Sequence, residues 1–483
     1  MNTPIVWTIA GADSSGCSGI AADLKTFQRF NVHGCAVVTA VTAQHFHELS
    51  HIDYLTPLTI QEQIHILQKE ASPKAIKIGM LGSFDLSSFL ENYKNPVILD
   101  PLLQASSGKP LFASDETSHI NNLRKLFPFI YLLTPNIPEA QALTNHAITS
   151  YQDIEIAAKK LINLGVKNVL IKGGHWDSAF SQDYWTNGRE HCWFANPRDT
   201  KDVRGTGCTL SSAITALLAQ DHDLLEAITL AKTYVNQAIR ESTKPWLHHT
   251  HAALQQKDLP YAALKPFSIE PFVCKDCGPT PLGLYPIVPD SEWLARLLPL
   301  GITTIQLRIK NKDLMFIEKE IQKSITLANQ YHARLFINDY WELAIRHKAY
   351  GVHLGQEDLT TASISAIQHA GLRLGISTHN YYELARAHAV RPSYIAFGAI
   401  FATQTKILAT APQGIEKLAQ WQKMLNYPVV AIGGINQENI AEVLKTHVKS
   451  IALISAITAA ADPIAMTTRL LDKYFDAHQL ENI

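Results

Sequence analysis

Short apolar segments alternate with helix-forming segments along nearly the whole chain, and this alternation limits the fold more than any other feature. Strands that follow one another with a helix between them form parallel sheets, and such sheets are covered by helices. We therefore expect an α/β fold. The chain has 483 residues, which is more than one ordinary domain holds, so two or more domains are expected.

A proline-rich segment interrupts the alternation at residues 241–283. Its prolines are Pro260, Pro266, Pro271, Pro279 and Pro281. Repeated prolines break the hydrogen-bonding pattern of both helices and sheets. We therefore expect a first domain at residues 1–255, a linker at 256–282 and a second domain at 283–483.

The first half contains apolar segments that predict strands of a mostly parallel sheet. They lie at residues 5–11, 35–43, 75–80, 96–101, 129–136 and 166–175. Several of them end in small or functional residues. In open α/β sheets ligands bind beyond the carboxyl ends of the strands. A binding site is therefore expected at that edge, with helices on both faces of the sheet.

The second half contains eight candidate strands. They lie at residues 284–288, 303–309, 333–338, 350–355, 372–377, 394–398, 428–433 and 450–455. Eight strands in roughly 200 residues match the lower size range of a TIM barrel. In the second candidate strand, aliphatic residues alternate with Gln306, Arg308 and Lys310. Burying these charges is costly without an anionic partner, so they are expected to point into a barrel mouth that binds anions.

The other residues that close the barrel strands define the expected contents of this mouth. They are Asn338, Asp339, Asp358, Ser377, Thr403, Thr405, Lys406, Gly433, Gly434 and Ser455. Two carboxylates beside cations suit a magnesium ion that bridges phosphate oxygens. Glycines near a helix start let backbone N–H groups approach a second phosphate. The pattern predicts a site for two anionic substrates, one of them held through metal.

The motifs QLRIK, IND, GVHLGQEDL, GIST, TQTK, AIGGI and LISAI resemble those of thiamine-phosphate synthase, from about Leu284 to the C-terminus. The resemblance implies condensation of hydroxymethylpyrimidine diphosphate with thiazole phosphate, releasing pyrophosphate. It assigns to the pyrimidine diphosphate Gln306, Arg308, Lys310, Asn338, Ser377 and Lys406. It assigns to the thiazole phosphate Thr403, Thr405, Gly434, Ile454 and Ser455. Asp339 and Asp358 would bind Mg²⁺. The chain has Ala399 and Ala402 where the family usually has prolines.

Charge develops on the departing pyrophosphate, so Arg308, Lys310 and Lys406 are the expected catalytic cations of the barrel. His353 lies in the middle of a barrel strand. We interpret it as a hydrogen-bonded core histidine and not as a catalytic group.

In the first half, the segment RGTGCTLSSAITALLA at residues 204–219 is the strongest local signal. Gly205 and Gly207 permit tight backbone geometry before a helix, whose N–H groups can stabilise a phosphate. Cys208 would lie in the first turn, where the helix dipole lowers the pKa of a thiol. The alternative is a small buried residue without a role.

This segment and IAGADSSGCSGIAADLKTF, VTAVTAQ, DPLL, TPNIPEA and VLIKGGH resemble hydroxymethylpyrimidine and phosphomethylpyrimidine kinase, which has a ribokinase-like fold. The match covers roughly residues 5–250. The resemblance implies that Gly11, Asp23 and Gln44 recognise the pyrimidine and that Cys208 activates the substrate hydroxyl or its phosphate. It implies an ATP and Mg²⁺ site that contains Asp100, Asn136, Glu139, Lys172 and Thr206. Lys172, Gly205 and Gly207 would neutralise the transferring phosphate.

Composition excludes several other classes. The 42 Lys and Arg residues balance 43 Asp and Glu residues, so no basic field for nucleic acid or membrane is expected. No signal peptide or membrane span is expected either, and we predict a cytoplasmic protein. Six cysteines are too few for a disulfide framework. Cys274 and Cys277 are interpreted as linker residues. His175, His248 and His249 are interpreted as residues of surface loops and not as metal ligands.

The two halves fit one pathway, because the product of the kinase is the pyrimidine substrate of the synthase. We therefore expect a bifunctional enzyme that uses ATP and Mg²⁺, acts on small molecules and is compatible with a homo-oligomer. One alternative is a pyridoxal-type kinase in the first half. The other is a non-catalytic ligand sensor built on inactive domains.

Overall fold

The computed structural model describes residues 3–104, 108–112, 115–174, 178–268, 273–310, 312–403 and 411–479. The chain forms two compact units, Met1–Ser268 and Ile269–Ile483. His175, Thr405 and Lys406 lie outside the described residues. None of the helices in these ranges combines the length and the hydropathy that a membrane span requires.

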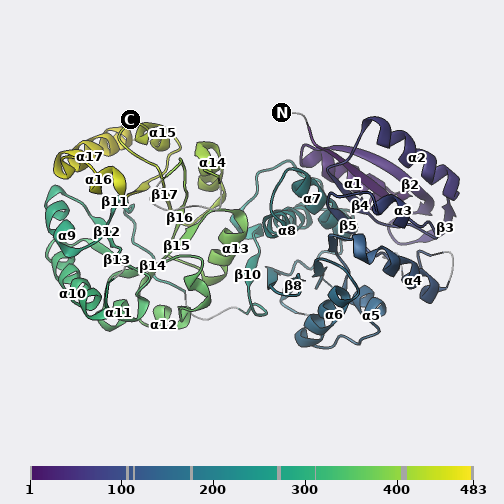
Figure 1. Ribbon diagram of the computed structural model, residues 1–483, viewed down its shortest axis with the longest axis horizontal. Coiled ribbons are helices and arrows are strands. Elements are labelled where there is room, and N and C mark those ends of the chain that lie inside the picture. Colours follow the sequence, from purple (N-terminus) through teal and green to yellow (C-terminus); the bar gives the residue numbers. More distant parts are fainter. Residues whose placement is uncertain are drawn as a thin grey trace. The chain divides into compact units, whose positions relative to one another are not determined.

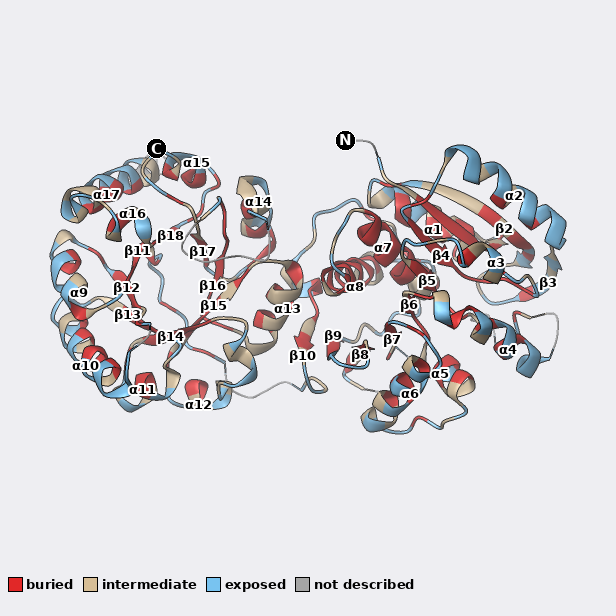
Figure 2. Cartoon of the chain, in the orientation of Figure 1, coloured by how far each residue is buried: buried red, intermediate tan, exposed pale blue. Residues whose placement is uncertain are grey.

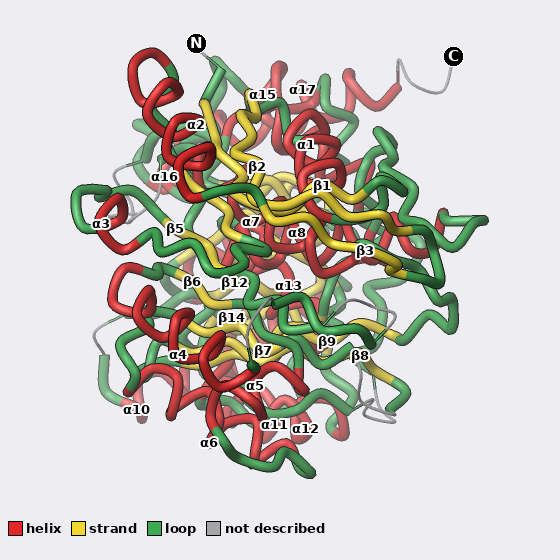
Figure 3. Tube along the Cα trace, turned by 90° about the vertical axis from the view of Figure 1, so that its right-hand side faces the viewer, coloured by secondary structure: helices red, strands yellow, loops and turns green. Residues whose placement is uncertain are grey.

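The first unit is built on one sheet whose strands run in the order β10-β9-β8-β7-β6-β5-β4-β1-β2-β3. Its strands are β1 (Ile5–Asp13), β2 (His33–Gln44), β3 (Leu49–Tyr54), β4 (Ala75–Ile78), β5 (Val97–Leu99), β6 (Leu132–Leu133), β7 (Val169–Ile171), β8 (Phe180–Thr186), β9 (His191–Pro197) and β10 (Tyr261–Ala263). The neighbours from β2 through β1 and β4 to β7 are parallel. Figure 3 shows β1, β2 and β3 side by side. The expected mostly parallel sheet is confirmed.

The strands at both edges of this sheet pair in antiparallel fashion, which the sequence patterns did not predict. β3 pairs with β2 at one edge, and β8, β9 and β10 extend the other edge beyond β7. β8 and β9 flank Asn187 and Gly188, and Gly188 has a φ of 87°. An Asn-Gly pair between two strands is a strong hairpin signal. β10 lies in the segment 256–282, for which we expected a linker.

The helices of the first unit are α1 (Gly19–Arg29), α2 (Pro57–Glu70), α3 (Ser87–Leu90), α4 (Glu116–Leu126), α5 (Ile137–Thr144), α6 (Tyr151–Asn163), α7 (Thr206–Ala219) and α8 (Leu224–Glu241). α7 is buried along almost its entire length (Figure 2). It is apolar or small all round, as a helix at the centre of a domain must be. It packs against α1, α8 and β4, so its N-terminus is fixed.

The second unit is a closed barrel whose strands are all parallel, which confirms the expected TIM barrel (Figure 1). Its strands are β11 (Gly283–Val288), β12 (Thr304–Leu307), β13 (Arg334–Asn338), β14 (Gly351–Leu354), β15 (Arg373–Thr378), β16 (Tyr394–Phe397), β17 (Val429–Ile432) and β18 (Ser450–Leu453). The surrounding helices are α9 (Ser291–Leu297), α10 (Leu314–Gln330), α11 (Trp341–Arg346), α12 (Ile364–His369), α13 (Tyr381–Val390), α14 (Gly414–Met424), α15 (Ile440–Leu444), α16 (Ser455–Thr458) and α17 (Pro463–Gln479).

Aromatic rings fill the interior of the barrel. Tyr285, Phe336 and Tyr394 are almost completely buried and contact one another. Two strand glycines make room for them. A Cβ at Gly375 would lie 2.1 Å from the Tyr394 ring, and a Cβ at Gly351 would lie 2.6 Å from the Phe336 ring. Glycine is therefore needed at both positions.

The residues before β11 pack against the amino-terminal end of the barrel. Arg334, at the start of β13, donates to the carbonyl oxygen of Thr280 at 2.9 Å, and Arg373, at the start of β15, donates to that of Asp276 at 3.1 Å. Cys274 and Cys277 are buried in this segment, and burial raises the pKa of each thiol to about 11. Both cysteines are therefore neutral packing residues, at the end of the barrel opposite the mouth.

Candidate active sites

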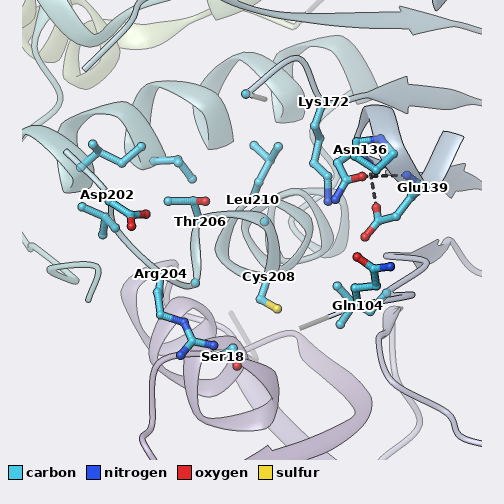
Figure 4. A pocket seen from close by; sticks show the side chains of 18 of the residues that line it. Ser18, Gln104, Asn136, Glu139, Lys172, Asp202, Arg204, Thr206, Cys208 and Leu210 are labelled. Atoms are coloured by element: carbon cyan, nitrogen blue, oxygen red, sulfur yellow. Dashed lines mark hydrogen bonds between the residues drawn. The ribbon is translucent and has the colours of Figure 1, made fainter. Parts of the chain in front are cut away.

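A cavity of about 750 Å³ lies in the first unit. It lies at the carboxyl ends of β1 and β2 and near β4, where the order of strands along the sheet reverses. Such a reversal is where open α/β sheets bind ligands. Most of the residues expected from the sequence line it, namely Gly11, Gln44, Asn136, Glu139, Lys172, Gly205, Thr206, Gly207 and Cys208 (Figure 4).

The turn before α7 depends on glycine at two positions. Gly205 has a φ of 88°, and a Cβ there would lie 2.0 Å from the carbonyl oxygen of Cys17. A Cβ at Gly207 would lie 3.3 Å from Lys172 Nζ. Gly205 is the N-cap of α7, and it provides no side-chain cap. The first N–H groups of a long buried helix therefore remain available to an anion in the cavity.

Lys172 lines the cavity beside this turn, and its partner Asp100 lies directly behind it, outside the lining. Lys172 Nζ donates to Asp100 Oδ1 at 2.6 Å, and Asp100 is completely buried. Its other oxygen, Oδ2, has no hydrogen-bond partner among the described residues, although a buried carboxylate oxygen is costly to leave unpaired. An unpaired carboxylate oxygen of this kind fits a ligand of Mg²⁺.

Asn136 and Glu139 cap the N-terminus of α5. The Asn136 side chain accepts from the Glu139 N–H at 2.8 Å, and Glu139 Oε2 accepts from the Asn136 N–H at 2.7 Å (Figure 4). Burial raises the pKa of Glu139, and Lys172 partly opposes this effect. The capping box therefore holds a second carboxyl group at the wall of the cavity, close to Lys172.

The expected lowering of the Cys208 pKa is wrong. Burial raises the pKa of this thiol to about 11, and Lys77 opposes the rise only in part. The loss of hydration outweighs the effects of Lys77 and of the Gly19 N–H, because the thiol is almost completely enclosed. Cys208 is therefore a neutral thiol at physiological pH.

Asp23 is not among the residues that line the cavity, although we expected it to contact the pyrimidine. It is fully buried and accepts hydrogen bonds from Thr8 Oγ1 at 2.6 Å, Lys77 Nζ at 2.8 Å and Ser212 Oγ at 2.6 Å. Ser212 is on α7, Thr8 on β1 and Lys77 on β4. Asp23, on α1, thus ties α7 to the sheet.

Replacing Asp23 with alanine should lower the free energy of unfolding of the first unit by about 3–5 kcal/mol, because Lys77 would remain as an unpaired buried charge. Urea unfolding measures this loss. The double change Asp23→Leu with Lys77→Met removes both charges and should cost less than the single change. If Asp23→Ala leaves unfolding unchanged and weakens only pyrimidine binding, Asp23 is a substrate contact instead.

In the barrel, four charged side chains gather at the carboxyl ends of β12 to β14. Arg308 and Lys310 follow β12, Asp339 follows β13, and Asp358 follows β14. Burial and the neighbouring Asp358 raise the pKa of Asp339, whereas Arg308 and Lys310 lower it. These groups are therefore close enough to interact, as the sequence predicts. Two carboxylates that repel each other beside an anion site fit a bound Mg²⁺.

A chain of hydrogen bonds crosses the barrel interior below these charges. Gln306 Nε2 donates to the Tyr285 hydroxyl at 3.2 Å, which lies 3.0 Å from the Tyr394 hydroxyl. That hydroxyl lies 2.8 Å from His353 Nδ1, and His353 Nε2 lies 2.8 Å from Ser377 Oγ. Burial lowers the pKa of His353 to about 3, so its ring is neutral. These hydrogen bonds connect Gln306 with Ser377, two residues expected to hold the pyrimidine.

The sequence patterns did not single out Tyr285 or Tyr394 as part of the site. Both occupy strands, β11 and β16, that were correctly predicted. Their only signal is a tyrosine at an otherwise apolar interior position of a barrel strand, where a buried hydroxyl needs a partner. Asn338 ends β13 and Ser455 begins α16 directly after β18. Both therefore lie at the mouth.

The Gly433–Gly434 turn follows β17 and has positive φ angles of 96° and 67°. A Cβ at Gly433 would lie 2.4 Å from the Ala399 side chain, and one at Gly434 would lie 2.6 Å from the Ala402 carbonyl oxygen. Glycine therefore lets this turn pack against the segment in which the chain departs from the family pattern. Thr403 ends the described part of that segment.

Two family models match the chain in consecutive regions. Phosphomethylpyrimidine kinase matches residues 13–253, and thiamine monophosphate synthase matches residues 284–457. Thiamine-phosphate synthase of Klebsiella pneumoniae is 56% identical over 199 residues, which are 41% of this chain and 94% of that protein. Thiamine-phosphate synthase of Photorhabdus laumondii is 58% identical over 191 residues, which are 39% of this chain and 88% of that protein.

Among solved structures, phosphomethylpyrimidine kinase from Clostridium difficile is 35% identical, with a TM-score of 0.44, and the match covers 49% of this chain and all of that one. Pyridoxal kinase from Staphylococcus aureus, in complex with AMP-PCP and pyridoxal, is 27% identical, with a TM-score of 0.45, over 50% of this chain and 90% of that one.

The layered first unit, with its glycine turn and buried lysine, and the barrel, with its charged mouth, define two transferases joined in one chain. The chain belongs to the phosphomethylpyrimidine kinase family in its first unit and to the thiamine-phosphate synthase family in its second. It is an enzyme of thiamine biosynthesis that combines both activities. The pyridoxal and sensor alternatives are not favoured.

Proposed function

We propose that the 750 Å³ cavity of the first unit is the site of two successive phosphorylations, of hydroxymethylpyrimidine and then of its phosphate, and that the barrel mouth uses the diphosphate. The observation that carries the proposal is the meeting of three features at one point. These are the uncapped start of α7, the Lys172–Asp100 pair and the unpaired oxygen of Asp100. Together they can receive the charge of a phosphate and of its metal.

In the first unit, Gln44 would bind the ring amine and nitrogen, since an amide both donates and accepts. Gly11 lines the same end of the cavity. The N–H groups from Gly205 to Cys208 and the Lys172 ammonium would stabilise the charge on the transferring group. Asp100 and Glu139 would hold Mg²⁺ with ATP, near Asn136 and Thr206. Bound Mg²⁺ would neutralise charge on the phosphate oxygens.

Cys208 should contribute through its backbone and its size, because a neutral thiol is a poor general base. Cys208→Ser should therefore retain kinase activity within about tenfold, whereas loss of a general base costs about 100- to 10,000-fold. Initial rates of ADP formation with hydroxymethylpyrimidine measure the effect. Alkylation of Cys208 by iodoacetamide should be slow at pH 8, because the pKa is about 11. A loss above a hundredfold in Cys208→Ser would assign the base to this thiol.

In the barrel, Arg308 and Lys310 would bind the diphosphate, with Lys406, which lies outside the described residues. Gln306, Asn338 and Ser377 would hold the pyrimidine ring. Thr403, Thr405, Gly434, Ile454 and Ser455 would hold the thiazole phosphate. Asp339 and Asp358 would bind Mg²⁺, which supplies a charge clamp for the diphosphate. As pyrophosphate leaves, the cations stabilise the negative charge, so this chain need not supply a base. We place the reaction in the cytoplasm.

Acceptor specificity tests the proposal for the first unit. The purified chain with ATP and Mg²⁺ should form ADP with hydroxymethylpyrimidine and with phosphomethylpyrimidine, and more slowly with pyridoxal. If ADP forms with pyridoxal but with neither pyrimidine, the first unit is a pyridoxal-type kinase and the proposal is wrong. Binding of both pyrimidines without any ADP would favour the ligand sensor.

A further inference from the structure

Arg204 is a buried cation of the first unit that lacks an anionic partner among the residues that the structure describes. It is 8% exposed and lines the cavity. Two buried lysines of the same unit, Lys77 and Lys232, and the partly exposed Lys172 each have a carboxylate oxygen within 2.8 Å. In the described part of the chain, Arg204 has no such ion pair. Its Nη1 donates to the His45 carbonyl oxygen at 2.6 Å, and its buried Nε has no hydrogen-bond partner.

The position of Arg204 is at the substrate end of the cavity. The backbone beside it contacts the loop before α1, since a Cβ at Gly205 would lie 2.0 Å from the Cys17 carbonyl oxygen. Its partner His45 directly follows Gln44, which also lines the cavity. In Figure 4 the guanidinium extends from the loop before α7 toward Ser18, on the same side as Cys208.

The N-terminus of α1 reaches the same place. Ser18 is the N-cap of α1, yet its hydroxyl donates to Asp13 Oδ2 at 2.7 Å and does not cap the helix. The Gly19 N–H is close enough to Cys208 to lower the pKa of the thiol. A helix N-terminus attracts anions through its free N–H groups and its dipole. The Arg204 guanidinium and the N-terminus of α1 therefore lie on the same side of the cavity as Cys208 (Figure 4). The Asp13 carboxylate also lines the cavity and accepts from the Ser18 N–H at 3.1 Å.

We infer that Arg204 and the N-terminus of α1 bind the phosphate that the substrate already carries when it is phosphorylated for the second time. This inference rests on the proposed function, in which one cavity serves both steps. Hydroxymethylpyrimidine brings no phosphate, so Arg204 has nothing to bind in the first step. Phosphomethylpyrimidine brings a charge of about −1.5 to −2, which supplies the missing partner. Arg204 thus determines specificity for the phosphorylated acceptor.

The chemistry of the second step is consistent with this position. An ionised oxygen of the acceptor phosphate attacks the γ-phosphorus of ATP, and a new P–O bond forms. The bond from the γ-phosphorus to the β–γ bridging oxygen breaks, and its electron pair leaves with ADP. No proton must be removed, because the acceptor phosphate is already ionised near pH 7. Arg204 would bind the oxygens that do not attack, holding the acceptor in line.

Arg204→Met tests the inference. The ratio kcat/KM for phosphomethylpyrimidine should fall about 100-fold, as expected for loss of a buried charge pair. For hydroxymethylpyrimidine it should fall less than about threefold, and the KM for ATP should not change. Arg204→Lys should restore part of the loss, because lysine keeps the positive charge but lacks the planar guanidinium that can bind two phosphate oxygens. Arg189→Met, at an exposed position, is the matched control. Thermal unfolding of the first unit, together with the retained phosphorylation of hydroxymethylpyrimidine, shows that the variant is folded.

Three results would overturn the inference. Equal losses for both acceptors would assign Arg204 to the phosphates of ATP or to the fold of the loop at His45. Unchanged rates for both would show that the guanidinium contacts no phosphate.

If the unaltered chain phosphorylates only hydroxymethylpyrimidine, the proposed function fails. Calorimetric binding of phosphomethylpyrimidine to the unaltered chain and to Arg204→Met then still decides the role of Arg204, and equal affinities would contradict it.

Discussion

Replacing Arg308 with methionine should lower the rate of thiamine phosphate formation by about 100- to 1,000-fold, which is the usual effect of removing one group that stabilises charge in the transition state. Arg308 lies at the carboxyl end of β12, where it lowers the pKa of Asp339 against the effects of burial and of Asp358. Without it, the two carboxylates repel each other more strongly, and the leaving pyrophosphate loses a cation. Methionine keeps the unbranched stem, so the barrel should fold.

The measurement is the initial rate with purified pyrimidine diphosphate and thiazole phosphate. Lys319→Met removes a cation from an exposed position of α10 and should change the rate less than twofold. ADP formation by the first unit should not change in either variant. A normal rate in Arg308→Met would show that Arg308 does not contribute to the reaction, although it lies at the mouth of the barrel.

Replacing Lys172 with methionine should lower both phosphorylation rates by about 1,000-fold. Lys172 Nζ is bound to Asp100 Oδ1 and lies against the glycine turn of α7. Its loss removes a positive charge from the transferring phosphate and leaves Asp100 as an unpaired buried carboxylate. The second effect should also weaken the binding of any metal that Asp100 holds.

ADP formation with each acceptor measures this loss. Lys159→Met, at an exposed position of α6, is the control. Thermal unfolding separates the catalytic loss from instability, because removing one partner of a buried pair also destabilises the fold. Lys172→Met with Asp100→Asn should restore stability but not activity. Phosphorylation within tenfold of the normal rate in the single variant would show that the α7 turn alone supports catalysis.

Sequence patterns predicted the barrel and the centre of the first sheet because parallel strands buried on both faces are short apolar segments of nearly constant spacing. β11 to β18 all coincide with predicted segments. β8, with the sequence FSQDYWT, contains Gln182 and Asp183, and both are buried through specific partners. Such a strand resembles a polar loop until its partners are known. The antiparallel edge was therefore missed.

Site residues at the ends of strands could be predicted because the fold itself brings these ends together. Arg308, Lys310 and Asp339 follow this rule. Three other properties depend on tertiary contacts that no pattern shows. The Asp23 carboxylate forms an ion pair with Lys77. Burial of Cys208 reverses the expected direction of its pKa shift. Arg204 is the first residue of the segment 204–219 that was recognised, yet only the structure shows that it has no anionic partner among the described residues.

The stoichiometry of phosphate transfer tests the two-site enzyme most directly. The purified chain should be mixed with hydroxymethylpyrimidine, thiazole phosphate, ATP and Mg²⁺, and the products followed by phosphorus NMR. Each thiamine phosphate formed should be accompanied by two ADP and one pyrophosphate, because the cavity of the first unit adds both phosphates and the barrel releases them together. One ADP per acceptor, with phosphomethylpyrimidine accumulating and no pyrophosphate released, would contradict two successive phosphorylations in one cavity.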